Sequence, residues 1–253
     1  MIVEVDAGLI DNVLLMSIIS FLSYFFLIIF SKILMKILNV SADRKIVFQF
    51  LLIFSNVGYM GYPVVDAVFP EYGIFYAVFN NIAFGIILWT YGVYLFNSEK
   101  EDFEIKWKNI FNNGVIASII GLTLLITSYK PPKAIMGALN SLSNMTFPLS
   151  MLIIGASLAK VNIKNIIKDK LLFIVTILRL IILPISLYLI LLLFNIPDII
   201  TIISVLLVAM PSAANTVIFA EEYDGNSTFA SEAIFLTTLF SLITIPFILF
   251  LTS

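Results

Sequence analysis

The chain is organised as long apolar stretches separated by short polar breaks. An α-helix needs about 20 apolar residues to cross the hydrocarbon core of a bilayer. The sequence offers eight such stretches, at residues 10–38, 45–70, 73–97, 109–128, 133–159, 170–194, 198–222 and 227–252. These runs are too long for membrane strands and do not alternate, so helices satisfy the backbone better than a barrel does. The pattern therefore predicts an all-α polytopic membrane protein.

Composition excludes several classes of function. Hydrophobic residues make up 61% and charged residues 12% of the chain, whereas soluble domains are about 45–50% apolar. With no cysteine and no histidine, disulfides, thiolate chemistry and histidine-based zinc or proton relays are ruled out. We expect no cofactor, no metal and no nucleic-acid partner, and the missing catalytic constellation argues against an enzyme. Acidic residues near Met1 argue against a cleavable signal peptide.

The lysines and arginines predict the orientation. Loops after the first, third and fifth spans hold most of them, namely Lys36, Arg44, Lys45, Lys100, Lys106, Lys108, Lys160, Lys164, Lys168 and Lys170. The opposite side holds only Lys130 and Lys133, and the discordant acidic loop at 221–224 counts little under the positive-inside rule. The three basic loops are therefore expected to be cytoplasmic, and both termini to lie outside the cytoplasmic (plasma) membrane.

Two of the spans contain polar and helix-breaking residues in mid-membrane. The second span holds Asn56, Gly58, Gly61 and Pro63, and the seventh holds Pro211, Ser212, Asn215 and Thr216. A proline removes a backbone donor and clashes with the preceding turn, so helical hydrogen bonding is expected to fail there. Freed backbone groups in hydrocarbon cost several kcal/mol each, roughly, unless protein, water or a ligand satisfies them.

The positions of the two breaks match. Each lies in the middle of three consecutive spans, and the two triplets run in opposite senses through the membrane. Inverted repeats with broken helices that cross at the midplane are typical of secondary transporters, in which half-helix N-termini present partial positive charge to an anion. Proline kinks that serve only packing remain an alternative, because proline and glycine are common in transmembrane helices.

Four other polar residues lie within predicted spans. Arg179 is about nine residues into the sixth span, where an arginine needs a partner or an aqueous cavity. It is expected either to hold the structure together, to pair with Glu232 at the start of the eighth span, or to counter a substrate carboxylate. Asn80 and Asn81 in the third span are accessory polar candidates, and they suit helix-helix contacts equally well.

Four segments in order resemble the auxin efflux carrier family, whose bacterial members are often described as malonate or organic-acid permeases. The segments are Asn56 to Pro63, Asn144 to Leu149 with Gly155 to Leu158, Arg179 to Pro184, and Pro211 to Thr216 with Ala220 to Tyr223. The resemblance covers essentially the whole chain. It implies an elevator-like carrier made of two inverted five-helix repeats, of which the first two of ten spans have no counterpart in this sequence.

The resemblance also implies a division of the chain. Residues 1–97 would form the first, incomplete repeat, 98–108 a cytoplasmic linker, 109–160 two scaffold-type helices, and 168–253 the second repeat. Spans 1–3 and 6–8 would make up the transport domain. A homodimer through the fourth and fifth helices is a further expectation.

The resemblance places the helix crossing around Pro63 and Pro211, with Gly58 and Gly61 beside it. The substrate-facing groups are then Asn56, Ser212, Asn215 and Thr216, and the expected function is alternating-access transport of a small organic anion, such as a carboxylate. Two alternatives stay open. One is a sodium-coupled symporter of the bile-acid-carrier type, and the other is a membrane subunit or sensor that does not transport.

Overall fold

The computed structural model describes residues 12–97, 113–127, 129–158 and 166–252. Four continuous helical stretches in this part of the chain are long and apolar enough to cross a membrane: Val13–Ile37, Gly73–Asn97, Lys170–Leu193 and Ser227–Thr252. Their bounds match the predicted first, third, sixth and eighth spans, with the largest difference at the start of the first. The all-α polytopic prediction is therefore confirmed. The predicted linker at 98–108 lies outside the described residues.

The first triplet of spans contains one interrupted helix between two continuous ones. Its elements are α1 (Val13–Ile37), α2 (Ala42–Ile53), the π-helical turn η3 (Val57–Gly61) with α3 (Tyr62–Val68), and α4 (Gly73–Ile87) with η4 (Leu88–Gly92) and α5 (Val93–Asn97). The chain leaves helical geometry between α2 and η3, where Phe54 is extended. The predicted second span is thus two half-helices.

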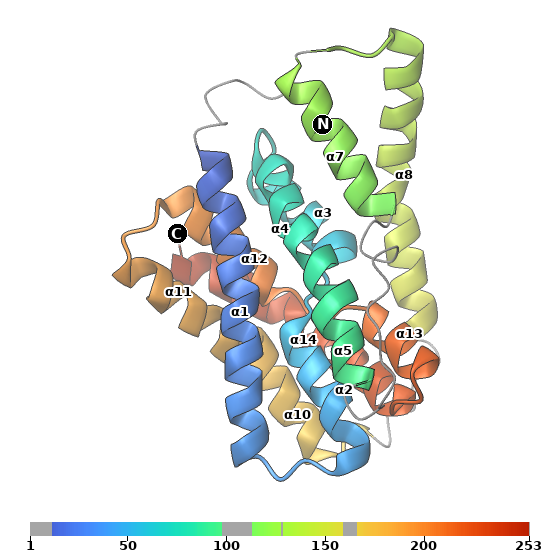
Figure 1. Cartoon of the computed structure of the whole chain (residues 1–253). Coiled ribbons are helices and arrows are strands. Elements are labelled where there is room, and N and C mark those ends of the chain that lie inside the picture. The colour runs from blue at the N-terminus through green and yellow to red at the C-terminus, as the bar shows by residue number, and fades with distance from the viewer. Residues whose placement is uncertain (1–11, 98–112, 128, 159–165, 253) are drawn as a thin grey trace.

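The second triplet repeats this order. Its elements are α10 (Lys170–Ile177) with η5 (Leu178–Ile182) and α11 (Leu183–Leu193), then α12 (Asp198–Ala209), α13 (Asn215–Glu222) and α14 (Ser227–Thr252). The seventh span breaks between α12 and α13, where Met210 is extended. Between the triplets, α7 (Asn113–Ile126) and α8 (Lys133–Leu158) lie to one side of the other helices (Figure 1).

The two triplets are interleaved. The broken helix of each contacts the continuous helices of the other, since α12 packs on α1 and α4 while α2 packs on α14. Helices α7 and α8 join at the periphery, where α8 contacts η3 and α14, and α7 contacts α4. Both interrupted helices are consequently held inside the bundle.

Aromatic rings fill the space around the end of α2. The ring of Phe50 packs on those of Phe54, Phe96 and Phe219, at centroid distances of 4.4, 5.4 and 5.1 Å. Gly92 in η4 allows this packing, because a Cβ there would lie 3.1 Å from Cε2 of Phe50. Aromatic pairs at such distances stabilise beyond their buried area, so this cluster fixes where α2 ends.

Candidate functional site: the crossing of two interrupted helices

The two interrupted helices meet at an antiparallel bridge between Ser55 and Ser212. The backbone N–H of Asn56 donates to the carbonyl of Pro211 at 2.8 Å, and the N–H of Ala213 donates to the carbonyl of Phe54 at 2.9 Å. Each break therefore supplies hydrogen-bonding partners to the other. This exchange avoids the free-energy cost of unpaired backbone groups inside a membrane-spanning bundle.

The last carbonyls of α2 are satisfied by side chains from the second triplet. Ser212 Oγ donates to the carbonyl of Leu51 at 3.1 Å, and Arg179 Nη1 donates to that of Leu52 at 3.1 Å. Carbonyls at a helix C-terminus have no partner within their own helix, and a cation there also complements the helix dipole. The C-terminus of α2 is thus capped across the crossing.

Arg179 is the largest fully buried side chain among the described residues, with 0% exposure. It lies in η5, and its Nε and Nη2 have no hydrogen-bonding partner in the described part of the chain. Of the roles considered for Arg179, pairing with Glu232 is not seen among the described residues. Arg179 reaches α2 instead, and the cation that acts on Glu232 is Arg44. Arg179 and Leu52 are far apart in the sequence, and no motif predicts their contact.

Two asparagines stand at the starts of the half-helices that leave the crossing. Asn56 precedes η3, and its Oδ1 accepts a hydrogen bond from the N–H of Tyr59 at 3.2 Å. Asn215 is the first residue of α13. Neither side-chain amide NH₂ forms a hydrogen bond with a described residue. Both amides therefore remain available as donors where the half-helix N-termini carry partial positive charge.

The other two predicted ligands are already used by the backbone. Ser212 caps α2 with its hydroxyl, and its backbone N–H donates to Thr237 Oγ1 at 3.3 Å. The hydroxyl of Thr216 donates to the carbonyl of Ala213 at 2.7 Å, and both side chains are fully buried. The structure thus brings all four predicted residues to the crossing but leaves only Asn56 and Asn215 with free donors.

The two prolines occupy different positions relative to the breaks. Pro211 lies in the extended segment after α12, as expected. Pro63 instead falls in the first turn of α3, past the interruption at Phe54 to Asn56. A proline is tolerated in the first turn because its missing N–H would have no partner there. The first break is set by the extended Phe54 and by Asn56, whose side chain caps η3.

The two glycines of the second span have different surroundings. A Cβ on Gly61 would lie 2.9 Å from Cδ2 of Leu207, so this glycine permits η3 to approach α12 closely. A Cβ on Gly58 would meet no atom within 4 Å, and the neighbouring Tyr59 is 40% exposed. Aromatic rings thus pack closely around the end of α2, whereas a side chain at Gly58 in η3 would meet open space.

The accessory asparagines both join helices. Asn80 is buried and accepts from the hydroxyl of Tyr24 in α1 at 3.4 Å. Asn81 places its side chain beside the hydroxyl of Tyr62 in α3. These contacts match the role of amides as links between helices in membranes.

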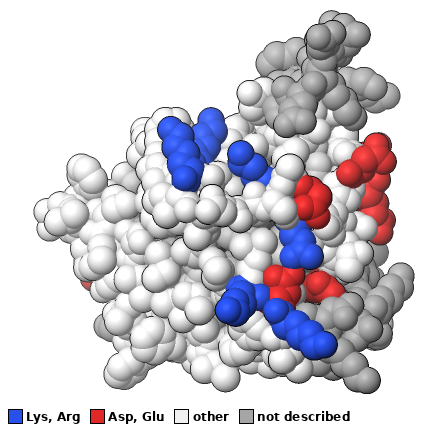
Figure 2. All heavy atoms as spheres, turned by 90° about the horizontal axis from the view of Figure 1, so that it is seen from below, with Lys and Arg blue, Asp and Glu red and all other residues white. Residues whose placement is uncertain are grey.

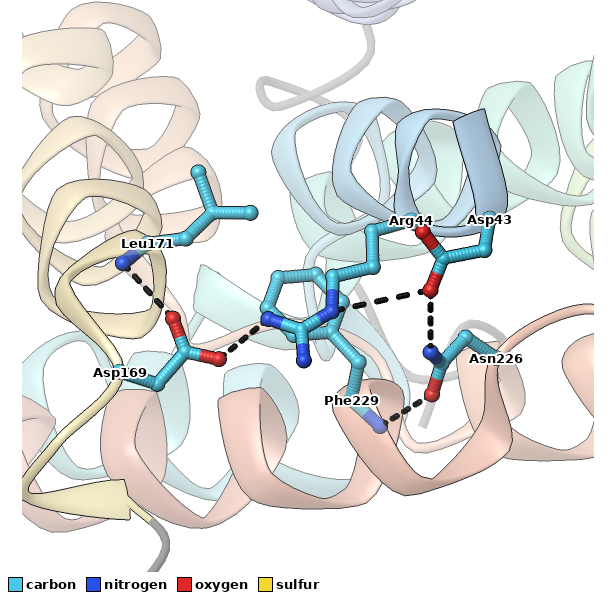
Figure 3. A network of polar contacts seen from close by, with 6 residues as sticks. All are labelled: Asp43, Arg44, Asp169, Leu171, Asn226 and Phe229. Atoms are coloured by element: carbon cyan, nitrogen blue, oxygen red, sulfur yellow. Dashed lines mark hydrogen bonds and ion pairs between the residues drawn. The ribbon is translucent and has the colours of Figure 1, made fainter. Parts of the chain in front are cut away.

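A second polar cluster joins the starts of α2, α10 and α14 (Figure 3). We call it the clasp, and its residues are Asp43, Arg44, Asp169, Asn226 and Phe229. Arg44 forms an ion pair with Asp169, and its guanidinium lies 5.1 Å from the ring centroid of Phe229. Sequence reasoning counted Arg44 only as a loop charge. The capping residues ahead of two helices, Asp169 and Asn226, were the signal for it.

Two residues of the clasp, Asp169 and Asn226, also cap helices. Asp169 Oδ1 accepts from the N–H of Leu171 at 3.0 Å, and Asn226 Oδ1 accepts from the N–H of Phe229 at 2.9 Å. The amide of Asn226 donates to Asp43 at 3.0 Å. Hydrogen bonds from Ser41 and Asn226 hold the pKa of Asp43 below its ordinary value.

A cavity of about 470 Å³ lies beside the clasp and is lined by Arg44, Lys168, Asp169, Thr228 and Glu232. Figure 2 shows this end of the molecule, where Lys, Arg, Asp and Glu gather on the surface between otherwise uncharged helices. The lining carries two cationic and two acidic side chains. The cavity is thus electrostatically mixed rather than a basic pocket for anions.

Known proteins give a consistent picture. The chain is 29% identical over 197 residues to an uncharacterized transporter of Methanocaldococcus jannaschii, and 28% identical over 193 residues to one of Methanothermobacter thermautotrophicus. Each match covers 76% of this chain and 63% of the relative, so the chain spans less than two thirds of their length. A family model described as membrane transport protein matches residues 3–249. With its interrupted, crossing helices, the chain therefore belongs to this membrane transport protein family, that of the auxin efflux carriers.

Proposed function

We propose that the protein carries a small organic anion, such as a carboxylate, across the cytoplasmic membrane by alternating access. The observation that carries this proposal is the pair of free amides, on Asn56 and Asn215, at two half-helix N-termini beside one hydrogen-bonded crossing. Neutral donors and helix dipoles attract a carboxylate without a permanent ion pair, so the anion can also leave.

The proposed movement follows from how the helices are divided. The interleaved triplets, α1 to α5 and α10 to α14, would move as one transport domain against α7 and α8. The approach to the crossing is supported by the open space beside Gly58 and the exposed ring of Tyr59. We also propose that two copies of the protein associate through α7 and α8. The basic loops would lie in the cytoplasm and both termini outside the membrane.

The sodium-coupled alternative receives less support. A sodium site needs oxygen ligands, and carboxylates are the usual charged ones. Among the described residues, the buried charged side chains are Arg179 and Glu232, and Glu232 lines the cavity beside the clasp. The crossing itself is thus served by a cation and by neutral polar groups, which suits an anion.

The test is uptake of radiolabelled malonate and a panel of related carboxylates into liposomes that contain the purified protein. We expect Asn56→Ala and Asn215→Ala each to lower uptake at least tenfold, the equivalent of about 1.4 kcal/mol. Asn97→Ala is the matched control, because Asn97 is 5% exposed like Asn56 but donates to the carbonyl of Val93 in its own helix. Well-folded Asn56 and Asn215 variants with unchanged uptake would remove the site assignment.

A further inference from the structure

Glu232 is a buried acid whose charge the structure leaves unpaired. It lies in the second turn of α14 and is 7% exposed. No ion pair or hydrogen bond joins it to another described residue, although it lines the cavity beside the clasp. Enclosure by protein leaves the carboxylate with less water than it has in bulk solution, and no described residue replaces that water with a hydrogen bond, which disfavours the charged form. A buried and unpaired acid that faces a cavity points to a proton as its ligand.

The neighbouring charges make the protonation state of Glu232 matter. Asp169 repels a negative charge on Glu232 and Arg44 attracts it. Arg44 is already held by Asp169 and lies 3.8 Å from Asp43. A charged Glu232 therefore competes with Asp169 for the same guanidinium, whereas a neutral Glu232 leaves that ion pair undisturbed.

We propose that Glu232 is a proton-binding site that exchanges with water in this cavity, and that its proton decides whether Asp169 alone holds Arg44. The chemistry is a simple acid-base step, in which the carboxylate takes a proton from hydronium, forms a carboxylic acid and leaves water. With the proton bound, the clasp is closed. Once the proton leaves, Arg44 is shared and the clasp loosens.

The other charged groups around α14 are placed so that they do not replace Glu232. Lys168 lies in the same cavity lining and moderates any negative charge there. Arg179 contacts Leu52, eight residues beyond Arg44 on α2, or about 12 Å along the helix. On α13, Glu221 and Glu222 are exposed to solvent. Neither carboxylate lines the cavity, so both positions serve as controls.

The clasp gives this site a route to the crossing. Arg44 lies in the first turn of α2, and the other end of α2 forms the bridge to the second interrupted helix. Protonation of Glu232 thus affects how firmly the clasp holds α2, the half-helix that leads to Asn56. Coupling between this proton and the carried anion rests on the proposed function. Proton binding by Glu232 does not depend on it.

The first experiment measures thermal unfolding of the purified protein in detergent, without substrate, from pH 4.5 to 8.5. We expect the unfolding temperature to fall by about 2–4 °C as pH rises through the range in which Glu232 loses its proton. Glu232→Gln, which stays neutral, should abolish this step, and Glu222→Gln should keep it. The proposal is overturned if Glu232→Gln keeps the full pH-dependent fall in unfolding temperature. It is also overturned if that fall is lost in Asp169→Asn but not in Glu232→Gln.

Two further measurements keep the proposal testable if Glu232→Gln folds poorly. The infrared carbonyl band of a protonated carboxylic acid in the unsubstituted protein should appear over the same pH range as the stability step, and no band there overturns the proposal. Uptake in liposomes against pH separates the two ideas. Uptake absent at every pH argues against the carrier function, while the stability step and the infrared band still decide the proton site.

Discussion

Ser55 and Ser212, 157 positions apart in the sequence, face each other across an antiparallel bridge. They belong to the middle helices of two triplets, and each helix is interrupted at this place. The N–H of Asn56 donates to the carbonyl of Pro211, and the N–H of Ala213 donates to that of Phe54, so each interruption supplies hydrogen-bonding partners to the other. The stability of this pairing can be tested residue by residue.

Arg179 is expected to stabilise the crossing as a donor rather than as a charge. Arg179→Leu leaves the carbonyl of Leu52 buried without its partner, which costs about 1–3 kcal/mol. Arg179→Gln retains an amide donor and removes the buried charge, so its unfolding temperature should stay closer to that of the unsubstituted protein. Thermal unfolding in detergent compares the two. Equal losses in both variants would show that the charge matters more than the hydrogen bond.

Gly61 and Gly58 form a matched pair for testing how closely the helices approach. Gly61→Ala places a methyl group 2.9 Å from Leu207 and should cost about 1–3 kcal/mol, the usual range for overpacking. Gly58→Ala meets open space, and alanine is the better helix former, so it should be neutral or slightly stabilising. Unfolding temperatures decide between them, and a more stable Gly61→Ala would contradict the close contact.

The hydroxyl of Ser212 tests the cap that it provides for α2. Ser212→Ala removes the donor to the carbonyl of Leu51 and should lower the free energy of unfolding by about 1–3 kcal/mol. Ser231→Ala is the control, because the Ser231 hydroxyl donates only to the carbonyl of Ser227 within its own helix. A similar small loss in both variants would mean that the contact across the crossing adds nothing.

Asn226 contributes to the clasp in two separable ways. Asn226→Ala removes the N-cap of α14, a change that typically costs about 1 kcal/mol, and it also removes one of the hydrogen bonds that lower the pKa of Asp43. A carboxyl with a lowered pKa stabilises the folded chain above its ordinary pKa, and this contribution is lost as pH falls through the folded-state value. Asn226→Ala should therefore show a smaller loss of unfolding temperature between pH 7 and pH 3.

A second variant separates the two roles. Asn226→Ser keeps an oxygen acceptor for the N-cap but loses the amide that donates to Asp43. It should recover most of the unfolding temperature at pH 7 and retain the weaker pH dependence of Asn226→Ala. Recovery of the original pH dependence would show that Asp43 does not depend on Asn226.

The predicted orientation can be checked by single-cysteine labelling, which has no background because the chain contains no cysteine. Glu71→Cys lies between α3 and α4, and Ser41→Cys lies between α1 and α2. Both positions are exposed. In intact cells, a membrane-impermeant maleimide should label Glu71→Cys and should label Ser41→Cys only after permeabilisation. The reverse pattern would invert the proposed topology.

Much of the fold could be predicted because hydrophobic length is a local property. The third and eighth predicted spans coincide with the helical stretches Gly73–Asn97 and Ser227–Thr252. The presence of two broken helices also followed from local residues such as Pro211. The position of the first break did not, because Pro63 suits the first turn of a helix as well as it suits a break.

The contacts of the site were harder to foresee because they join distant parts of the chain. Arg179 meets the carbonyl of Leu52, and no sequence pattern indicates which of many buried carbonyls an arginine will reach. The local role of Thr216, which donates to Ala213, is also a matter of side-chain geometry. The roles of Asn56 and Asn215 as anion ligands stay a prediction.

The bridge between the two triplets has a mechanical consequence. The two interrupted helices cannot slide past each other without breaking two backbone hydrogen bonds, from Asn56 to Pro211 and from Ala213 to Phe54. The crossing is thus a rigid connection rather than a hinge. Under the proposed function, a solute held at the crossing would move together with both helices, and the sliding surface would lie elsewhere, among side chains that share no such bonds.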